Sequence, residues 1–191
     1  MNRLEHLDSM NFRIETDRLI MRVEDIPMAE DILDFYIRNK DHLAPYEPDK
    51  IDSFYTVRYH QTALQLEMKK TLEGSEIRYY LYEKKNPDFI IGVVNLYRIV
   101  RGSFDSATIA YKLDQKHTGK GYAFEAVMRL MQLAYEDLHL HRVECRVVTY
   151  NDRSIRLLEK AGFSREGLER QTVRIGGKWE DTYRYAYVFE E

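Results

Sequence analysis

A short glycine-containing loop between an apolar strand and an amphipathic helix constrains the fold of this chain more than any other feature. The sequence predicts a strand over Ser106 to Leu113, a helix whose apolar residues recur at helical spacing from Ala123 to Leu138, and a strand over Arg142 to Thr149. The loop from Lys116 to Gly121 connects the first strand to the helix. A strand, helix and strand in this order form a βαβ unit, so we expect the two strands to be parallel.

This loop has the composition of a phosphate-binding turn. Gly119 and Gly121 let the backbone turn sharply and approach a ligand closely, and the first N–H groups of the following helix favour an anion. Its basic residues are Lys116, His117 and Lys120. A Walker loop requires Ser or Thr where Gly121 stands, and a dinucleotide fingerprint requires a third glycine where Phe124 stands. Both nucleotide motifs are therefore disfavoured, while a phosphate site is retained.

The remaining strands predict a mixed α/β sheet, mostly antiparallel, with helices packed on it. The expected strands are Arg18 to Val23, Ile77 to Glu83, Phe89 to Tyr97, Gln171 to Ile175 and Asp181 to Phe189. The turn residues Lys85 to Asp88 and Gly176 to Lys178 indicate two hairpins.

Three further helices are expected. Asp25, followed by Pro27, caps a short helix that runs to about Ile37. A longer helix is capped by Asp52 or Ser53 and ends at Gly74. A last short helix runs from about 154 to 160.

The composition is that of one ordinary globular domain spanning residues 1–191, with about the first ten residues expected to be loosely held. A formal net charge of −3 gives no general case for nucleic acid or membrane binding, and we expect neither a leader nor a membrane span. The single Cys145 excludes an intramolecular disulfide and favours a cytoplasmic protein. His139 and His141 lack a third ligand at useful spacing, so no metal is expected.

A second motif follows the βαβ unit: the run from Asn151 to Phe163, which reads Asn-Asp-Arg-Ser-Ile-Arg-Leu-Leu-Glu-Lys-Ala-Gly-Phe. Together with the element order, the glycine loop, Glu15 to Leu19 and the pair Glu166-Gly167, this run resembles the GNAT acyltransferase superfamily. The likeness is greatest to the bacterial ribosomal-protein N-terminal (alanine or serine) acetyltransferases. It covers nearly the whole chain from about Phe12 and implies a single domain of the GNAT-like fold.

The resemblance implies that acetyl-coenzyme A is the co-substrate and lies between the two parallel strands. Its pyrophosphate is expected on the backbone of Lys116, His117, Thr118, Gly119, Lys120, Gly121, Tyr122 and Ala123. Its pantetheine arm is expected beside Tyr111, Lys112 and Leu113. The family usually has Gln or Arg where Lys116 stands, and lysine keeps the positive charge without the planar, bidentate geometry of Arg.

The resemblance also implies Glu144 as the catalytic base, acting through water. Glu47, in the segment that walls the substrate cleft of the family, is the second candidate. Each carboxylate has an ordinary interpretation as well. Glu144 then alternates outward on its strand and pairs with Arg142 or Arg146, and Glu47 is a loop charge between two prolines.

Ser154 is the residue expected to meet the departing sulfur of the donor. A serine hydroxyl is far less acidic than a thiol, whose pKa is about 8.5, so we expect stabilisation of the thiolate by a hydrogen bond rather than full proton transfer. Some relatives use a tyrosine one turn later, where this chain has Leu158. Asn151 and Ser154 also suit a helix cap, and both roles can coexist.

The acceptor is expected to be a primary amine. An α-amine titrates at roughly 8 and a lysine side chain at roughly 10.4, so the neutral nucleophile is more available at a protein N-terminus. We therefore favour a protein N-terminus, with ribosomal proteins as candidates. A small amine such as a polyamine or an aminoglycoside stays open, as do a non-catalytic acyl-coenzyme A binding module and the oligomeric state.

Cys145 and three tyrosines carry weaker signals. Cys145 lies on the apolar face of its strand and is expected to be a buried thiol rather than a nucleophile. Tyr183, Tyr185 and Tyr187 share one face of the last strand. That spacing fits a packed sheet face, and an aromatic wall of the substrate groove is the alternative.

Overall fold

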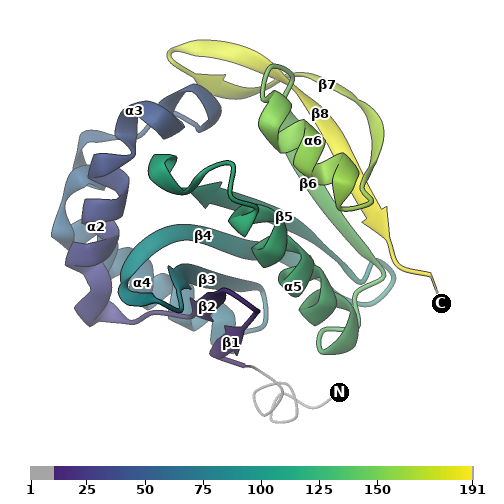
Figure 1. Ribbon diagram of the computed structural model, residues 1–191. Helices are drawn as coiled ribbons and strands as arrows, with labels where there is room; N and C mark the ends of the chain where they lie inside the picture. Colours follow the sequence, from purple (N-terminus) through teal and green to yellow (C-terminus); the bar gives the residue numbers. More distant parts are fainter. Residues whose placement is uncertain (1–10, 191) are drawn as a thin grey trace.

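An eight-stranded sheet organises the chain in the computed structural model, which describes residues 11–190 (Figure 1). The strand order is β1-β2-β3-β4-β5-β6-β8-β7. The strands are β1 (Arg13–Glu15), β2 (Leu19–Arg22), β3 (Glu76–Glu83), β4 (Asn86–Val100), β5 (Ser106–Leu113), β6 (Arg142–Val148), β7 (Ser164–Ile175) and β8 (Lys178–Val188). The expectation of a loosely held start falls on residues 1–10 and lies outside the described residues.

The sheet splits between β5 and β6. β5 and β6 are parallel, as the βαβ order predicted, and the other neighbouring strands pair antiparallel. The parallel register runs from Ser106 opposite Arg142 to Thr108 opposite Glu144. β5 then continues on β4 as far as Leu113, so β5 and β6 part beyond Thr108. The mixed, mostly antiparallel fold class is confirmed.

Helices cover both faces of the sheet. α2 (Ala29–Arg38), α3 (Lys40–Leu43) and α4 (Val57–Leu72) belong to one side, and α5 (Tyr122–Glu136) and α6 (Asp152–Lys160) to the other (Figure 1). Alternation along β4 separates two cores: Val94 and Leu96 share a cluster with Leu130 of α5, whereas Val93 shares one with Ile32 of α2. In the part of the chain that the structure describes, no helix is long and apolar enough to cross a membrane.

The start of α4 corrects one prediction. Thr56, rather than Asp52 or Ser53, caps this helix, because its backbone is extended and its Oγ1 accepts the N–H of Tyr59 at 3.3 Å. The predicted cap residues belong to a separate 3-10 turn over Asp52–Tyr55.

Two other caps agree with the sequence. Asp25 accepts the N–H of Ile26 at 2.7 Å, although the first turn is a 3-10 turn over Ile26–Met28 that leads into α2. Asn151 Oδ1 accepts the N–H of Ser154 at 3.2 Å, so the predicted capping role of Asn151 is confirmed and α6 begins at Asp152.

The last hairpin is longer than predicted. β7 begins at Ser164 rather than Gln171, and its register with β8 shifts between Glu169 and Val173. Gln171 lies in this irregular stretch with a φ of +52°. A bulge interrupts the alternation of side chains, which is the signal that marks a strand in a sequence. The first half of β7 was therefore missed.

Candidate active site

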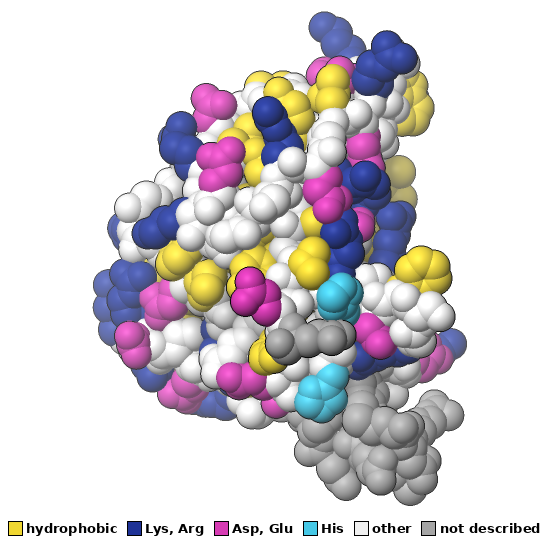
Figure 2. All heavy atoms as spheres, turned by 90° about the vertical axis from the view of Figure 1, so that its right-hand side faces the viewer, with side chains coloured by type: hydrophobic (Ala, Val, Ile, Leu, Met, Phe, Trp, Pro, Cys, Tyr) yellow, Lys and Arg dark blue, Asp and Glu magenta, His cyan; other side chains and the backbone are white. Residues whose placement is uncertain are grey.

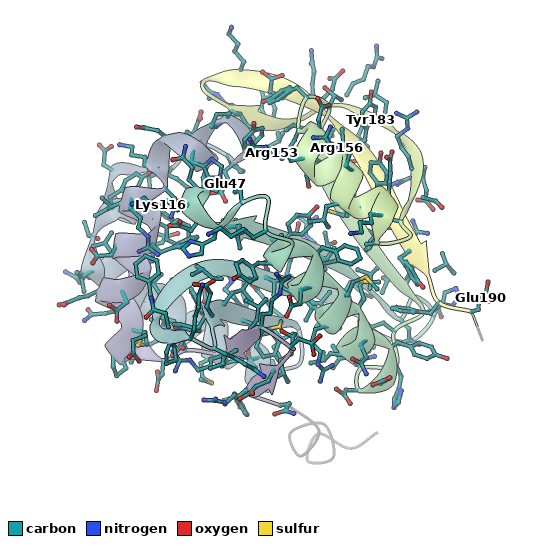
Figure 3. All side chains as sticks on the ribbon, in the orientation of Figure 1. Glu47, Lys116, Arg153, Arg156, Tyr183 and Glu190 are labelled. Carbon is teal, nitrogen blue, oxygen red and sulfur yellow. The ribbon has the colours of Figure 1, made fainter. Side chains whose placement is uncertain are left out.

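A groove of about 1330 Å³ lies where β5 and β6 part. Its walls come from the loop before α5, from α6, from the segment after α3 and from the irregular stretch of β7. Figure 3 labels Glu47 in the segment after α3 and Arg153 and Arg156 on α6, and all three side chains line the groove. The groove therefore joins the glycine loop to the second sequence motif.

The glycine loop forms one end of this groove. Gly119 and Gly121 have φ values of +75° and +84°, a left-handed backbone that favours glycine. Gly121 directly precedes α5, whose first N–H groups have no partner within the helix. The loop residues that line the groove are Thr118, Gly119, Gly121, Tyr122 and Ala123.

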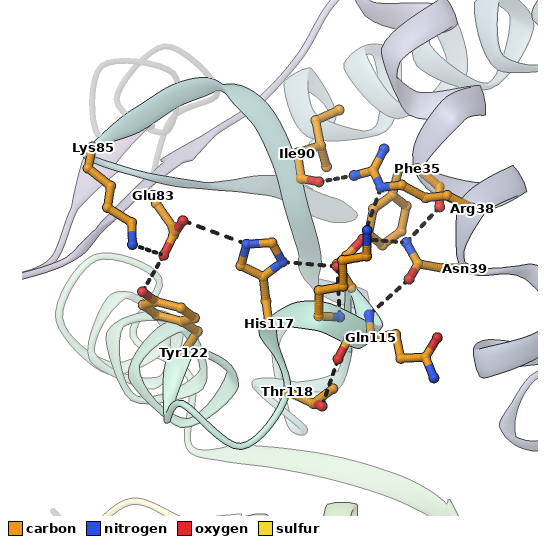
Figure 4. A network of polar contacts seen from close by, with 12 residues as sticks. Phe35, Arg38, Asn39, Glu83, Lys85, Ile90, Gln115, His117, Thr118 and Tyr122 are labelled. Carbon is orange, nitrogen blue, oxygen red and sulfur yellow. Dashed lines mark hydrogen bonds and ion pairs between the residues drawn. The ribbon is translucent and has the colours of Figure 1, made fainter.

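Asp114 fixes the start of the loop by hydrogen bonds to residues that Figure 4 labels, among them Arg38, Asn39 and His117. One carboxylate oxygen accepts the N–H of Lys116 at 3.0 Å and contacts Nδ1 of His117 at 2.9 Å. The other accepts Nε of Arg38 at 2.9 Å and Nδ2 of Asn39 at 3.0 Å. Burial raises the pKa of Asp114, but these donors outweigh it and lower the pKa to about 2. The sequence reasoning did not single out this residue.

The basic side chains of the loop are not among the groove-lining residues in the described part of the chain. The His117 ring lies between Asp114 and Glu83, with Nε2 3.6 Å from a Glu83 carboxylate oxygen. The positive charge of the groove therefore comes from elsewhere. The roles of Lys116, His117 and Lys120 in donor binding stay predictions that concern their backbone.

Arg18 fixes the end of the loop. Its guanidinium donates to the carbonyl oxygen of Lys120 at 2.9 Å and to the carboxylate of Glu125 at 2.6 Å. Thr16 also donates to Glu125, at 2.5 Å. Glu125 lies in the first turn of α5, where the helix dipole favours a carboxylate. The sequence assigned no contact in the site to Thr16 or Arg18, and here they explain why the loop and α5 are held together.

Ser154 and Tyr111 meet across the groove. Tyr111 Oη lies 2.5 Å from Ser154 Oγ and 3.3 Å from the carbonyl oxygen of Ser154. Both side chains line the groove, together with Asn151, Lys112 and Leu113. The structure thus brings together the residues that the sequence placed beside the pantetheine arm and the thiol.

Glu47 lies in the groove and is ion-paired. It contacts Nζ of Lys112 and lies 3.1 Å from Nζ of Lys50. Burial raises the pKa of Glu47, but the two ammonium groups outweigh it and the net pKa falls below its usual range. Burial opposes the charge of Lys112 as well, while Tyr36 and Glu47 raise its pKa by more. Both groups are therefore charged near neutral pH.

Glu144 has a different environment. It accepts Nε of Arg142 at 2.9 Å, lies 4.0 Å from Nη1 of Arg146, and is not among the described residues that line the groove. Arg142 also pairs with Glu166, so these side chains form a ladder of alternating charge on β6 and β7. On the side of the molecule that Figure 2 shows, basic and acidic side chains lie next to one another. These contacts match the ion-paired interpretation, and the role of Glu144 as a base stays a prediction.

Glu169 is a groove carboxylate that the sequence reasoning missed. It lines the groove from β7 and accepts Nε of Arg146 at 2.7 Å. It also lies 3.7 Å from Nη1 of Arg184. The only signal that could have revealed it was strand alternation, which the irregular stretch of β7 interrupts.

Charge in the groove is strongly one-sided. Its basic side chains are Lys50, Arg98, Lys112, Arg146, Arg153, Arg156, Lys160 and Arg170. Its acidic side chains are Glu47 and Glu169, and each is already paired with a basic neighbour. The formal net charge of the whole chain is −3, so the positive potential belongs to the groove and not to the protein at large.

The buried thiol and the tyrosines behave as sheet residues. Burial raises the pKa of Cys145 to about 12, so its thiol stays protonated and unreactive near neutral pH. Tyr185 is buried in the core and donates to Glu159 at 3.1 Å, and Tyr183 and Tyr187 pack against the same core. The packed-face interpretation of the three tyrosines is confirmed.

Within residues 11–190 no group of three or more His, Cys, Asp or Glu side chains is arranged to hold a metal ion.

A parallel strand pair that parts beside a glycine loop, with a basic groove between, defines a class of site: one that binds a ligand carrying phosphates. Comparisons with known proteins agree. Residues 3–164 match the family model described as Acetyltransferase (GNAT) domain. The chain belongs to this GNAT acetyltransferase family, and it is an acyltransferase that uses acetyl-coenzyme A as co-substrate.

Two relatives and one solved structure illustrate the similarity within this family. The chain is 36% identical over 163 residues to the probable N-acetyltransferase YjcK of Bacillus subtilis, covering 85% of this chain and 90% of the relative. It is 32% identical over 169 residues to the [ribosomal protein uS5]-alanine N-acetyltransferase of Escherichia coli, covering 88% and 87%. The crystal structure of the ribosomal-protein-S5-alanine acetyltransferase of Vibrio fischeri superimposes with a TM-score of 0.89 at 25% identity, covering 95% of this chain and 98% of that one.

Proposed function

We propose that this protein transfers an acetyl group from acetyl-coenzyme A directly to the N-terminal amine of a protein. The observation that carries the proposal is the charge of the groove: eight basic side chains and two acidic ones, both of the acidic ones already paired. Such a groove suits an anionic donor. It offers little to an acceptor that carries several positive charges.

The donor fits the groove by shape and by charge. The backbone of Gly119 and Gly121 and the start of α5 form a seat for a pyrophosphate. Arg153, Arg156 and Lys160 line the α6 wall, where further phosphate charge can be balanced. Beyond Thr108 the edge of β5 is not paired with β6, which leaves backbone groups that an amide-containing pantetheine arm can pair with.

The chemistry requires a neutral amine, a polarised carbonyl and a stabilised leaving group. The amine nitrogen forms a bond to the carbonyl carbon, the carbon–sulfur bond breaks, and the electron pair stays on sulfur as a thiolate. The proton of the attacking amine passes to a carboxylate or to water. Backbone N–H groups at the end of β5 suit polarisation of the carbonyl, and Ser154 suits a hydrogen bond to the sulfur. No covalent intermediate on the enzyme is needed.

The acceptor assignment follows from charge and from relatedness. A polyamine needs unpaired carboxylates, whereas Glu47 and Glu169 already pair with Lys112 and Arg146. A protein N-terminus brings one amine, which loses its charge at roughly pH 8 and therefore needs no carboxylate to hold a cation. The relationship to the uS5-alanine acetyltransferase of Escherichia coli supports a protein substrate, with a ribosomal protein as the first candidate.

The test is an acceptor panel with release of free thiol as the readout and mass spectrometry of the products. The panel holds a peptide with the alanine N-terminus of uS5, the same peptide with a blocked N-terminus, spermidine and an aminoglycoside. We expect kcat/KM for the free peptide to exceed that for spermidine at least tenfold, and no turnover of the blocked peptide. Faster turnover of spermidine or of the aminoglycoside would show a small-molecule enzyme. Tight binding of acetyl-coenzyme A without thiol release from any acceptor would favour a non-catalytic binding module.

A further inference from the structure

The contact between Tyr111 and Ser154 joins the two sides of the groove. Tyr111 comes from β5 and Ser154 from α6, and their hydroxyl oxygens are 2.5 Å apart. A separation of this size between two hydroxyls is a short hydrogen bond. Asn151 holds the backbone of Ser154 at the same time, by accepting its N–H at 3.2 Å. Ser154 is therefore fixed from its own helix and from the opposite strand.

The direction of this hydrogen bond follows from the two groups. Burial raises the pKa of Tyr111 far above its usual range, so its phenol keeps its proton at any working pH. A phenol is also the stronger donor of the two, since its pKa of about 10 lies well below that of an aliphatic hydroxyl. The phenol has one hydrogen and two oxygens near it, Ser154 Oγ at 2.5 Å and the Ser154 carbonyl oxygen at 3.3 Å. The shorter contact is the stronger hydrogen bond, so Tyr111 donates to Ser154 Oγ.

That direction leaves the hydroxyl hydrogen of Ser154 available. A serine in a helix commonly returns its hydrogen to the carbonyl four residues earlier. In the described part of the chain, the side-chain oxygen of Ser154 contacts Tyr111 instead. Ser154 lines the groove, so its hydrogen can turn toward a ligand there. α6 offers no phenol for this task one turn later, because Leu158 occupies that place and is buried in the core.

We propose that Tyr111 is a positioning residue for acetyl transfer: it donates to Ser154 Oγ and so directs the Ser154 hydroxyl hydrogen at the departing sulfur. The inference rests on the proposed function, in which Ser154 stabilises the thiolate. The Tyr111 proton does not leave the phenol. Cooperative hydrogen bonds strengthen one another, so the Ser154 hydroxyl donates more strongly when its oxygen accepts from Tyr111.

The experiment is a double-mutant cycle on the full chain, with kcat and KM for acetyl-coenzyme A measured for the wild type, Tyr111→Phe, Ser154→Ala and the double variant. We expect Tyr111→Phe to lower kcat about tenfold with KM within twofold, and Ser154→Ala to lower kcat at least as much. The double variant should match Ser154→Ala, because Tyr111 acts through Ser154. Tyr185→Phe is the matched control. It removes the phenol of a buried tyrosine, which donates to the exposed Glu159, and kcat should stay within twofold of the wild type.

The outcomes separate the two ideas. An unchanged kcat in Tyr111→Phe, or an equal loss from Tyr111→Phe in the presence and absence of Ser154, overturns the positioning role. An unchanged kcat in Ser154→Ala overturns the proposed role of Ser154 itself. The pH dependence of kcat supplies a second readout: a positioning residue lowers the whole profile, whereas loss of the alkaline limb in Tyr111→Phe would make Tyr111 a proton donor and overturn the inference. Thermal melts of each variant show whether a loss of kcat reflects unfolding.

Discussion

Asp49 Oδ1 accepts the backbone N–H of Gly176 at 2.6 Å, across 127 residues of sequence. Asp49 Oδ2 accepts the N–H of Gly177 at 3.0 Å, and the Asp49 N–H donates to the carbonyl oxygen of Arg174 at 3.3 Å. The segment after α3 is therefore fastened to the tip of the β7–β8 hairpin. Two walls of the groove, which come from distant parts of the chain, are held at a fixed separation by one carboxylate.

Replacing Asp49 with Ala should loosen the two walls that Asp49 joins, the segment after α3 and β7, which we assign to the amine acceptor. The glycine loop and α6, where the donor is proposed to bind, should stay intact. We expect KM for the amine acceptor to rise about tenfold, while the Kd for acetyl-coenzyme A, measured by calorimetry, stays within twofold. Asp52→Ala is the control, because Asp52 is exposed on the same segment. A rise in the donor Kd as large as the rise in acceptor KM would contradict the assignment of these two walls to the acceptor.

Gly121→Glu should abolish binding of acetyl-coenzyme A. The backbone of Gly121 is left-handed with a φ of +84°, and an added Cβ would lie 3.2 Å from Nη2 of Arg18, the side chain that holds the loop. A glutamate there would displace the loop backbone and add negative charge beside the proposed pyrophosphate seat, which repels the phosphates. Gly102→Glu is a matched control: Gly102 has a φ of +81°, and an added Cβ meets no atom within 4 Å among the described residues. Both variants should lose roughly 1 kcal/mol of stability to backbone strain. A Kd that rises less than tenfold in Gly121→Glu would show that the loop is not the seat.

The sequence predicted the parts of the fold that local patterns determine. Period-two and period-3.6 alternation located the βαβ unit, and the order of its elements made the pair parallel. The sequence also predicted the site residues that belong to a motif. Gly119, Gly121, Asn151 and Ser154 do lie around one groove. These residues are informative because backbone conformation and capping restrict which residue types can stand there.

Other parts of the site depend on contacts between distant segments. In the sequence, Asp114 is one acidic residue at the end of a strand. It meets Arg38 and Asn39 only because α2 packs against the loop. Tyr111 was expected to serve through its backbone, and its contact with Ser154 depends on the position of α6 relative to β5. Glu169 was hidden by the irregular stretch of β7. The part that each of these three residues plays in the site depends on its position in the folded chain, and not on its residue type.

The two candidate bases can be compared directly. Glu47→Gln should lower kcat/KM at least tenfold, because Glu47 lines the groove and its loss leaves the partly buried Lys112 without a carboxylate partner. Glu144→Gln should leave kcat/KM within twofold, since its carboxylate binds Arg142 away from the groove lining. Steady-state kinetics from pH 5 to 9 would show whether either variant loses the acidic limb of the profile. A tenfold loss in Glu144→Gln with little effect of Glu47→Gln would restore Glu144 as the base.

Asp114 should make stability depend on acid. Its pKa is about 2 in the folded protein against an ordinary value of 3.8, so the folded state binds this proton less readily than the unfolded state. The stabilisation is present in full above about pH 5 and is lost as the pH falls toward 2, and at about 1.4 kcal/mol per pKa unit it amounts to about 2.5 kcal/mol. Urea unfolding of the wild type and Asp114→Asn should therefore differ by at least about 2 kcal/mol at pH 7, and the difference should shrink by about that amount between pH 5 and pH 2. Asp17→Asn, at an exposed position, should show no such trend. A difference between wild type and Asp114→Asn that does not change with pH would mean that the contacts of Asp114 with Arg38, Asn39 and the loop do not depend on its charge.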